Sequence, residues 1–199
     1  MADLCIEGSA FLLARRDVLA LVESGRLTRA ALEHRLDPAD LAQLDATPLA
    51  ACWYPVARYE RLMRVLLELE GGGDPQYLVG RARKGLETLV RGGIHGPLER
   101  AEAAVREGAR DWFERSGHIL ATLPSAFFDQ GAWRLSRDGS RGVFTLEGSG
   151  VDLPPCVLRI VQGAVECVAE QLTGGRVEVA PHAAGRGRVL FVGTEQRPA

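Results

Sequence analysis

The chain has 199 residues, of which 46% are hydrophobic and 25% are charged, which is the composition of an ordinary globular protein. Its 24 basic and 26 acidic side chains give a net charge of -2, and this balance excludes the strongly basic surface typical of proteins that bind nucleic acids or anionic membranes. The length suffices for one domain, or for two small ones that share a core, without disulfide or metal support.

The N-terminal segment lacks the pattern of a signal peptide, because its only early charges are acidic and the Arg15-Arg16 pair follows the apolar run. No stretch of about 18 uncharged apolar residues predicts a transmembrane helix. The four cysteines show no C-x-x-C spacing, which is typical of a reduced protein. We therefore expect a cytoplasmic protein, and abundant Ala and Gly with more Arg than Lys favour a bacterial source.

Helical periodicity dominates the first two-thirds of the chain. An apolar pattern over 15–27 is interrupted by Ser24-Gly25, and Thr28 and Asp37 stand where the N-caps of two short helices are expected. These signals predict a helical region that begins near the N-terminus.

A longer helix is expected to begin at Pro55 and to end at the glycines 71–73. Its apolar residues form a stripe that suits either the core or a partner subunit: Tyr59, Leu62, Met63, Leu66 and Leu69. The segment DPQYLVGRARKGLETLVRGG predicts the next helix, and a further one is expected from Pro97 to about Gly117.

Strand patterns replace helical patterns in the last third of the chain. The segment AWRLSRDGSRGVFTLEG predicts two strands around an Asp138-Gly139 turn. The segment GRVEVAPHAAGRGRVLFVG predicts a second hairpin with Gly185 and Gly187 in its turn. A helix over 154–172 separates the two hairpins.

These elements predict an α+β fold. A mostly helical region over 1–125 precedes a four-stranded antiparallel sheet over 126–199, in the order β-β-α-β-β with a covering helix, and the two parts share one core.

Cys156 and Cys167 lie on the same side of the helix 154–172, about 16 Å apart along its axis. A disulfide needs Cα atoms within roughly 7 Å, so the pair forms neither a disulfide nor a site for one metal ion. We interpret both as small residues on a packing face, with a lone reactive or cofactor-contacting cysteine as the alternative. The helix is amphipathic, and its polar stripe opposes the apolar face: Arg159, Gln162, Glu166 and Glu170.

The segment CVLRIVQGAVECVAEQLTGGRVEVAPHAAGRGRVLFVG resembles the end of the vinyl-reductase-type domain, with Gly163-Ala164 inside the helix and Gly174-Gly175 after it. That domain belongs with the heme–nitric-oxide-binding and TRAPP-like folds. Upstream, CWYPVARYERLMRVLLE and YLVGRARKGLE resemble a helical region of a myxobacterial paralogous family of unknown function. Together these resemblances cover about 45–193. They imply a sensor or scaffold fold that binds small apolar ligands or pairs with itself or with partners, and that is rarely a catalyst alone.

A heme-binding member of this fold needs a proximal histidine on a helix that faces an apolar pocket. His118 precedes an apolar run, whereas His95 stands between glycines. The Tyr-x-Ser-x-Arg motif that holds heme propionates is missing, because Ser136 and Arg137 in WRLSRD have a different spacing. The Cys-rich ending of some relatives is also missing. We therefore expect no cofactor and no metal.

No G-x-S-x-G or H-E-x-x-H motif predicts a reaction. Cys52 precedes a predicted helix start, where a thiolate would be stabilised, or it is a buried cysteine beside an aromatic anchor. Arg58, Arg61 and Arg64 are balanced by glutamates and indicate a solvated helix face. Trp53 and Tyr54 are interpreted as a hydrophobic staple before the helix that begins at Pro55.

The sequence favours a non-catalytic bacterial regulatory or interaction protein that holds a small apolar ligand between its helices and its sheet. We expect a homodimer, with a protein partner or a small ligand in signalling. The alternative is an enzyme or a redox or heme protein that uses Cys52 or His118. The candidate ligand-binding residues, which line either the core or a cavity, are Trp53, Tyr54, Tyr59, Trp112, His118 and Phe127.

Overall fold

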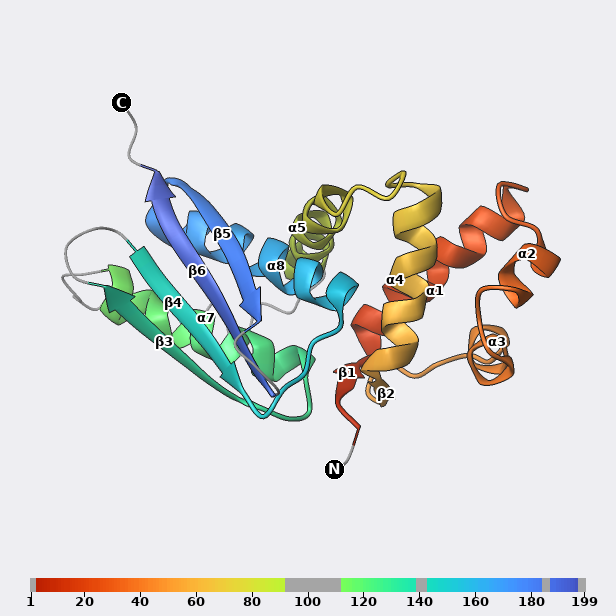
Figure 1. Cartoon of the computed structure of the whole chain (residues 1–199), viewed down its shortest axis with the longest axis horizontal. Helices are drawn as coiled ribbons and strands as arrows, with labels where there is room; N and C mark the ends of the chain where they lie inside the picture. The colour runs from red at the N-terminus through yellow and green to blue at the C-terminus, as the bar shows by residue number, and fades with distance from the viewer. Residues whose placement is uncertain (1–2, 92–111, 139–142, 184–186, 197–199) are drawn as a thin grey trace.

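The computed structural model describes residues 3–91, 112–138, 143–183 and 187–196. The N-terminal half contains β1 (Cys5–Glu7), α1 (Gly8–Glu23), α2 (Arg29–Glu33), α3 (Pro38–Asp45), β2 (Trp53–Pro55), α4 (Val56–Leu69) and α5 (Gln76–Arg91). The C-terminal half contains α7 (Trp112–Phe127), β3 (Ala132–Asp138), β4 (Val143–Ser149), α8 (Pro155–Thr173), β5 (Arg176–Ala183) and β6 (Arg188–Gln196). Figure 1 shows α1 to α4 at one end of the molecule, the larger sheet at the other, and α5 and α8 between them.

The larger sheet has four strands in the order β3-β4-β6-β5, and every neighbouring pair is antiparallel. Helix α8 connects β4 to β5 and packs on the sheet, and α7 packs beside it against β3. The predicted combination of helices with antiparallel strands is confirmed. The turns predicted at Gly139 and Gly185 lie outside the described residues, and so does the part before residue 112 of the helix expected from Pro97 to about Gly117.

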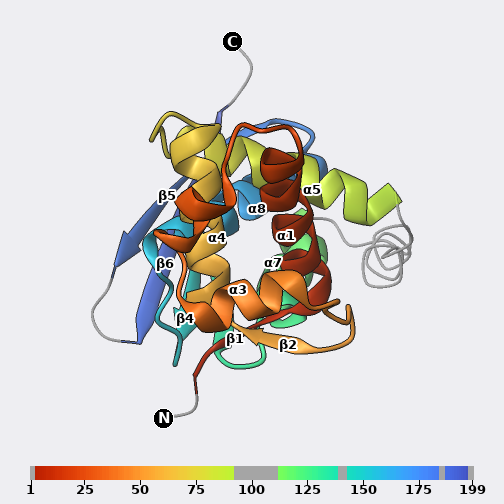
Figure 2. The ribbon, with the colours of Figure 1, turned by 90° about the vertical axis from the view of Figure 1, so that its right-hand side faces the viewer.

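Two short helices in the N-terminal half begin where the sequence predicts. The Thr28 hydroxyl accepts a hydrogen bond from Ala31 N at 3.1 Å, and the Asp37 carboxylate accepts one from Asp40 N at 2.8 Å. Both side chains therefore act as N-caps, which satisfy backbone donors that have no partner inside the helix. Figure 1 shows α2 and α3 at the end of the molecule that is far from the larger sheet, and Figure 2 views the molecule from that end.

The residues around Trp53 form a strand, not the start of a helix. Strand β2 pairs antiparallel with β1, with Tyr54 opposite Ile6. Tyr54 stacks on Phe11 at a centroid distance of 4.6 Å, whereas Trp53 is 45% exposed. The interpretation of Trp53 as a staple is therefore wrong. Cys52 is exposed and is separated from α4 by β2, so the expectations of a buried thiol and of a thiol at a helix start are both wrong.

The apolar stripe of α4 belongs to the core. Its central residues are almost fully buried within one hydrophobic cluster that extends into the C-terminal half: Tyr59, Leu62, Met63 and Leu66. The sequence left open whether this stripe packs in the core or against a partner subunit, and the structure shows that it packs in the core.

The polar stripe of α8 is not a solvated face, because α5 and β5 cover it. Gln162 donates to the Val179 carbonyl at 2.8 Å, and Glu166 accepts from Val179 N at 3.2 Å. Arg83 of α5 forms ion pairs with Glu166 and Glu170. These partners satisfy polar groups that would otherwise be costly to bury. Cys156 and Cys167 are both buried, which confirms that they are small packing residues.

Glu60 is a second polar group that the sequence placed on a solvated face. It is buried, and its Oε2 accepts hydrogen bonds from Cys156 N at 2.9 Å and Val157 N at 3.1 Å. A carboxylate is stabilised at this position because the first turn of a helix presents free N–H groups. Arg61 on the same helix binds buried Asp40, so this face of α4 is an ion-paired contact with α3 and α8.

Candidate functional site

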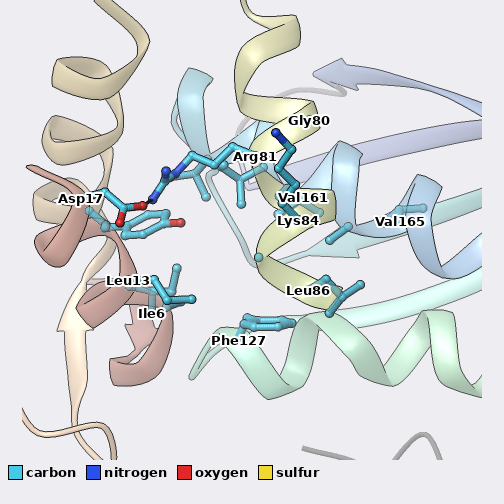
Figure 3. A pocket seen from close by; sticks show the side chains of 18 of the residues that line it. Ile6, Leu13, Asp17, Gly80, Arg81, Lys84, Leu86, Phe127, Val161 and Val165 are labelled. Atoms are coloured by element: carbon cyan, nitrogen blue, oxygen red, sulfur yellow. Dashed lines mark hydrogen bonds and ion pairs between the residues drawn. The ribbon is translucent and has the colours of Figure 1, made fainter. Parts of the chain in front are cut away.

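A cavity of about 560 Å3 lies where α1, α5, α7 and α8 meet beside α4, and Figure 3 shows residues that line it. Its size falls in the range of pockets that hold small ligands. Most of its wall is aliphatic, with contributions from Ile6, Leu13, Leu86, Leu123, Val157, Ile160, Val161 and Val165.

Helix α8 supplies one whole wall of the cavity. Residues of its apolar face recur at the spacing that places them on one side of a helix, and those that line the cavity are Val157, Ile160, Val161, Ala164 and Val165. The face that the sequence assigned to core packing therefore serves the cavity as well.

Charged side chains lie along one side of the cavity. Figure 3 shows Asp17 of α1 facing Arg81 of α5, with Ile6, Leu13 and Phe127 on the opposite side. The Arg81 guanidinium donates through Nη2 to Asp17 Oδ2 at 2.5 Å, and the two side chains are only 19% and 25% exposed. Burial acts to lower the pKa of Arg81, but the hydrogen bond and charge of Asp17 outweigh it and raise that pKa. Arg81 therefore stays a cation.

Two tyrosines place phenol groups near this ion pair. Burial raises the pKa of Tyr59 to about 12, and burial together with a hydrogen bond to Glu70 raises the pKa of Tyr77 to about 12. The Tyr77 hydroxyl donates to Glu70 Oε2 at 2.5 Å. The Tyr59 ring lines the cavity, and within the described part of the chain no group hydrogen-bonds to its hydroxyl. Both phenols are protonated donors at neutral pH.

The structure brings together two of the six residues predicted to bind a ligand. Tyr59 and Phe127 line the cavity, whereas Trp53 and Tyr54 belong to β2 and are not part of its wall. Trp112 begins α7, and His118 lies within the same helix. The side chains of these last two lie outside the described part.

Asp17 and Arg81 are two of the polar cavity residues that were not predicted from the sequence. Arg81 lies in GRARKG, which is basic but short, and its partner Asp17 is 64 residues away. The local signal was the spacing of Tyr77, Arg81 and Lys84, which places all three on one side of α5.

Over the described ranges, no group of three or more His, Cys, Asp or Glu side chains has the arrangement of a metal site. None of the helices in those ranges is long and apolar enough to cross a membrane.

Solved structures with a similar fold are H-NOX proteins. A mutant H-NOX protein from K. algicida, in its unliganded Fe(II) form, matches with a TM-score of 0.56 and 12% identity, over 96% of this chain and 97% of that chain. A mutant H-NOX protein from T. tengcongensis matches with a TM-score of 0.55 and 11% identity, over 96% of this chain and 98% of that chain. An H-NOX structure from a study of heme distortion matches with a TM-score of 0.54 and 11% identity, over 97% of this chain and 96% of that chain.

At such low identity these matches show a shared fold and nothing finer. No family model matches the sequence, and the sequence search of curated proteins found no match. The resemblance to the heme–nitric-oxide-binding fold is confirmed at the level of the fold. The resemblances to the vinyl-reductase-type domain, to the TRAPP-like fold and to the myxobacterial family stay predictions.

Proposed function

We propose that this chain is a non-catalytic sensor domain that binds a small, mainly apolar molecule in the cavity between α1, α5, α7 and α8. One observation carries the proposal: an apolar cavity of about 560 Å3 is walled by elements from both halves of the chain. A ligand there would contact α1 and α8 at once, so its binding energy would depend on how the two halves are placed. That dependence is what a sensor requires.

The chemistry of the cavity wall supports binding more than catalysis. Among the described residues, the wall contains no Ser, Thr, Cys or His that could act as a nucleophile or a base. Its carboxylates already have partners, since Asp17 binds Arg81 and Glu70 binds Tyr77. Cys52, on which the enzymatic alternative depended, is not part of this wall.

The H-NOX structures support a small-ligand role, because one is described as unliganded Fe(II) and another concerns heme. Heme iron needs an axial ligand from the protein. In the described wall the only side chains of that type are the phenols of Tyr59 and Tyr77, and a pKa of about 12 keeps both protonated. His95 and the side chain of His118 lie outside the described residues. The described wall thus supplies no histidine to heme iron, and the ligand that we propose contains no metal.

Filling the cavity tests the proposal. We expect the fluorophore N-phenyl-1-naphthylamine, which is uncharged and apolar, to gain fluorescence with the wild-type chain and to lose this gain in Ala164→Phe. Ala164 lines the cavity and is partly exposed to it, so the added ring occupies the space of the ligand. Gln171→Phe, at an exposed position of the same helix, should keep the wild-type response. Equal fluorescence in wild type and Ala164→Phe, with circular dichroism unchanged, would contradict the proposal.

The homodimer, the protein partner, the cytoplasmic location and the bacterial source are further parts of this proposed role. We infer that pairing would use a surface other than the α4 stripe, because that stripe is buried within the chain.

A further inference from the structure

The most unusual polar group in the cavity is the hydroxyl of Tyr59. The side chain is only 5% exposed, lines the cavity, and has no hydrogen-bond partner for its hydroxyl within the described ranges. A phenol in a cavity wall that has no partner from the described part of the chain can donate its proton to an acceptor on a ligand.

Arg81 provides donors beside it. A guanidinium carries five N–H donors, and Asp17 takes one of them through Nη2. Tyr59, Arg81 and Asp17 line the same cavity. A ligand oxygen at this point can accept from the phenol and the guanidinium together. Charged acceptors form stronger hydrogen bonds than neutral ones.

The charge balance of the wall favours an anion. Two arginines of the wall share one carboxylate, since both Arg16 and Arg81 form ion pairs with Asp17. Glu70, the other carboxylate of the wall, pairs with Arg26. The group of Arg16, Arg81 and Asp17 thus carries one positive charge in excess, and although Arg16 is exposed, Arg81 is largely buried beside the apolar part of the cavity. One negative charge on the ligand would balance it.

The rest of the wall favours an aliphatic body. Branched aliphatic side chains from α5, α7 and α8 dominate it, and such groups contact a hydrocarbon without a preferred orientation. Phe128, one of its aromatic residues, already stacks on Trp133 at a centroid distance of 6.4 Å.

We propose that the ligand is an amphipathic monoanion of the alkyl carboxylate class, whose carboxylate accepts hydrogen bonds from Tyr59 and Arg81 and whose chain fills the aliphatic part of the cavity. This inference rests on the proposed function, since it names the class of molecule that the same cavity takes.

Calorimetric titration of the full chain with dodecanoate and with dodecan-1-ol tests the class. We expect dodecanoate to bind at least about tenfold more tightly than the alcohol, because a hydrogen bond to a charged acceptor contributes more than one to a neutral acceptor. If both bind equally, the carboxylate assignment is overturned while the apolar cavity site stands. If dodecanoate, dodecan-1-ol and the uncharged fluorophore all fail to bind, the proposed function fails as well.

Variants assign the head-group contact to named residues. Tyr59→Phe should weaken dodecanoate binding about tenfold, and Arg81→Met should reduce dodecanoate to the affinity of the alcohol. Asp17→Asn should strengthen dodecanoate binding, because it removes the competing carboxylate from Arg81. If the ion pair of Arg81 and Asp17 were purely structural, substitutions of its two residues would not change dodecanoate affinity in opposite directions.

Matched controls lie close by. Tyr54→Phe removes a phenol that bonds to Leu49, away from the cavity, and Arg83→Met removes an α5 arginine that pairs with Glu166 and Glu170. Both controls should keep wild-type affinity for dodecanoate. Wild-type affinity in Tyr59→Phe and Arg81→Met would overturn the proposal.

Discussion

Glu60 shows how one buried carboxylate connects the two halves of the chain. It lies on α4, and its Oε2 accepts hydrogen bonds from the first backbone N–H groups of α8 at 2.9 and 3.1 Å. Arg64, one turn later on α4, balances its charge at 3.2 Å. This contact fixes the start of α8, and therefore the positions of the residues with which α8 lines the cavity.

We expect Glu60→Ala to lower the free energy of unfolding by about 2 kcal/mol, because it removes a helix cap and leaves two buried donors without an acceptor. Urea unfolding followed by circular dichroism measures the change. Glu68 lies on the same helix as Glu60 and forms an exposed ion pair with Arg35. Glu68→Ala should therefore change the free energy of unfolding very little. A Glu60→Ala chain as stable as the Glu68→Ala chain would show that the cap does not hold the two halves together.

At the scale of whole elements, the crossing of α5 and α8 also fixes the position of α8. A Cβ at Gly163 would lie 2.3 Å from the Val79 carbonyl oxygen, so the two helices approach as closely as only glycine permits. This close approach brings Arg81 of α5 and the apolar face of α8 to the same cavity.

Gly163→Ala should therefore destabilise the chain by about 2 kcal/mol, since the helices must separate to admit one methyl group. Gly85→Ala on α5 is the matched control, because nothing lies within 4 Å of its added Cβ. We expect this control to raise stability by about 0.5 kcal/mol, as Gly→Ala does in an unobstructed helix. Thermal unfolding that shows the same sign for both variants would contradict the close crossing.

Local signals explain why some elements could be predicted from the sequence and others could not. Helix α8 begins at Pro155, directly after Pro154, and is terminated by Gly174, whose φ is 70°; the sequence displays both signals directly. Strands β1 and β2 have three residues each and depend on contact between segments about 50 residues apart, so no local pattern reveals them.

The same distinction applies to the site. Tyr59 and Phe127 were predicted because aromatic residues are conspicuous in a helical pattern, but a pattern cannot separate a cavity wall from a core. Arg81 was missed because its role depends on Asp17, which lies on another helix and far away in the sequence. The burial of Glu166 was missed for the same reason, since its partners lie on α5 and β5.

At the scale of the whole molecule, the cavity lies where the N-terminal helices meet the half that carries the sheet. Its wall includes Asp17 from the first helix and Val165 from the last one. A ligand that fills this space adds contacts to both halves, whereas an empty cavity leaves those wall atoms without neighbours. Occupancy is therefore expected to change how firmly the halves are held together.

The location of binding is the most direct test of this account. Methyl correlation spectra of the full chain, labelled at Ile, Leu and Val and titrated with dodecanoate, report on each wall separately. We expect saturating ligand to shift the methyl signals of Ile160, Val161 and Val165, which line the cavity, and to leave those of Val177 and Val189 in the larger sheet nearly unchanged. Shifts confined to the sheet, or none at saturating dodecanoate, would contradict it.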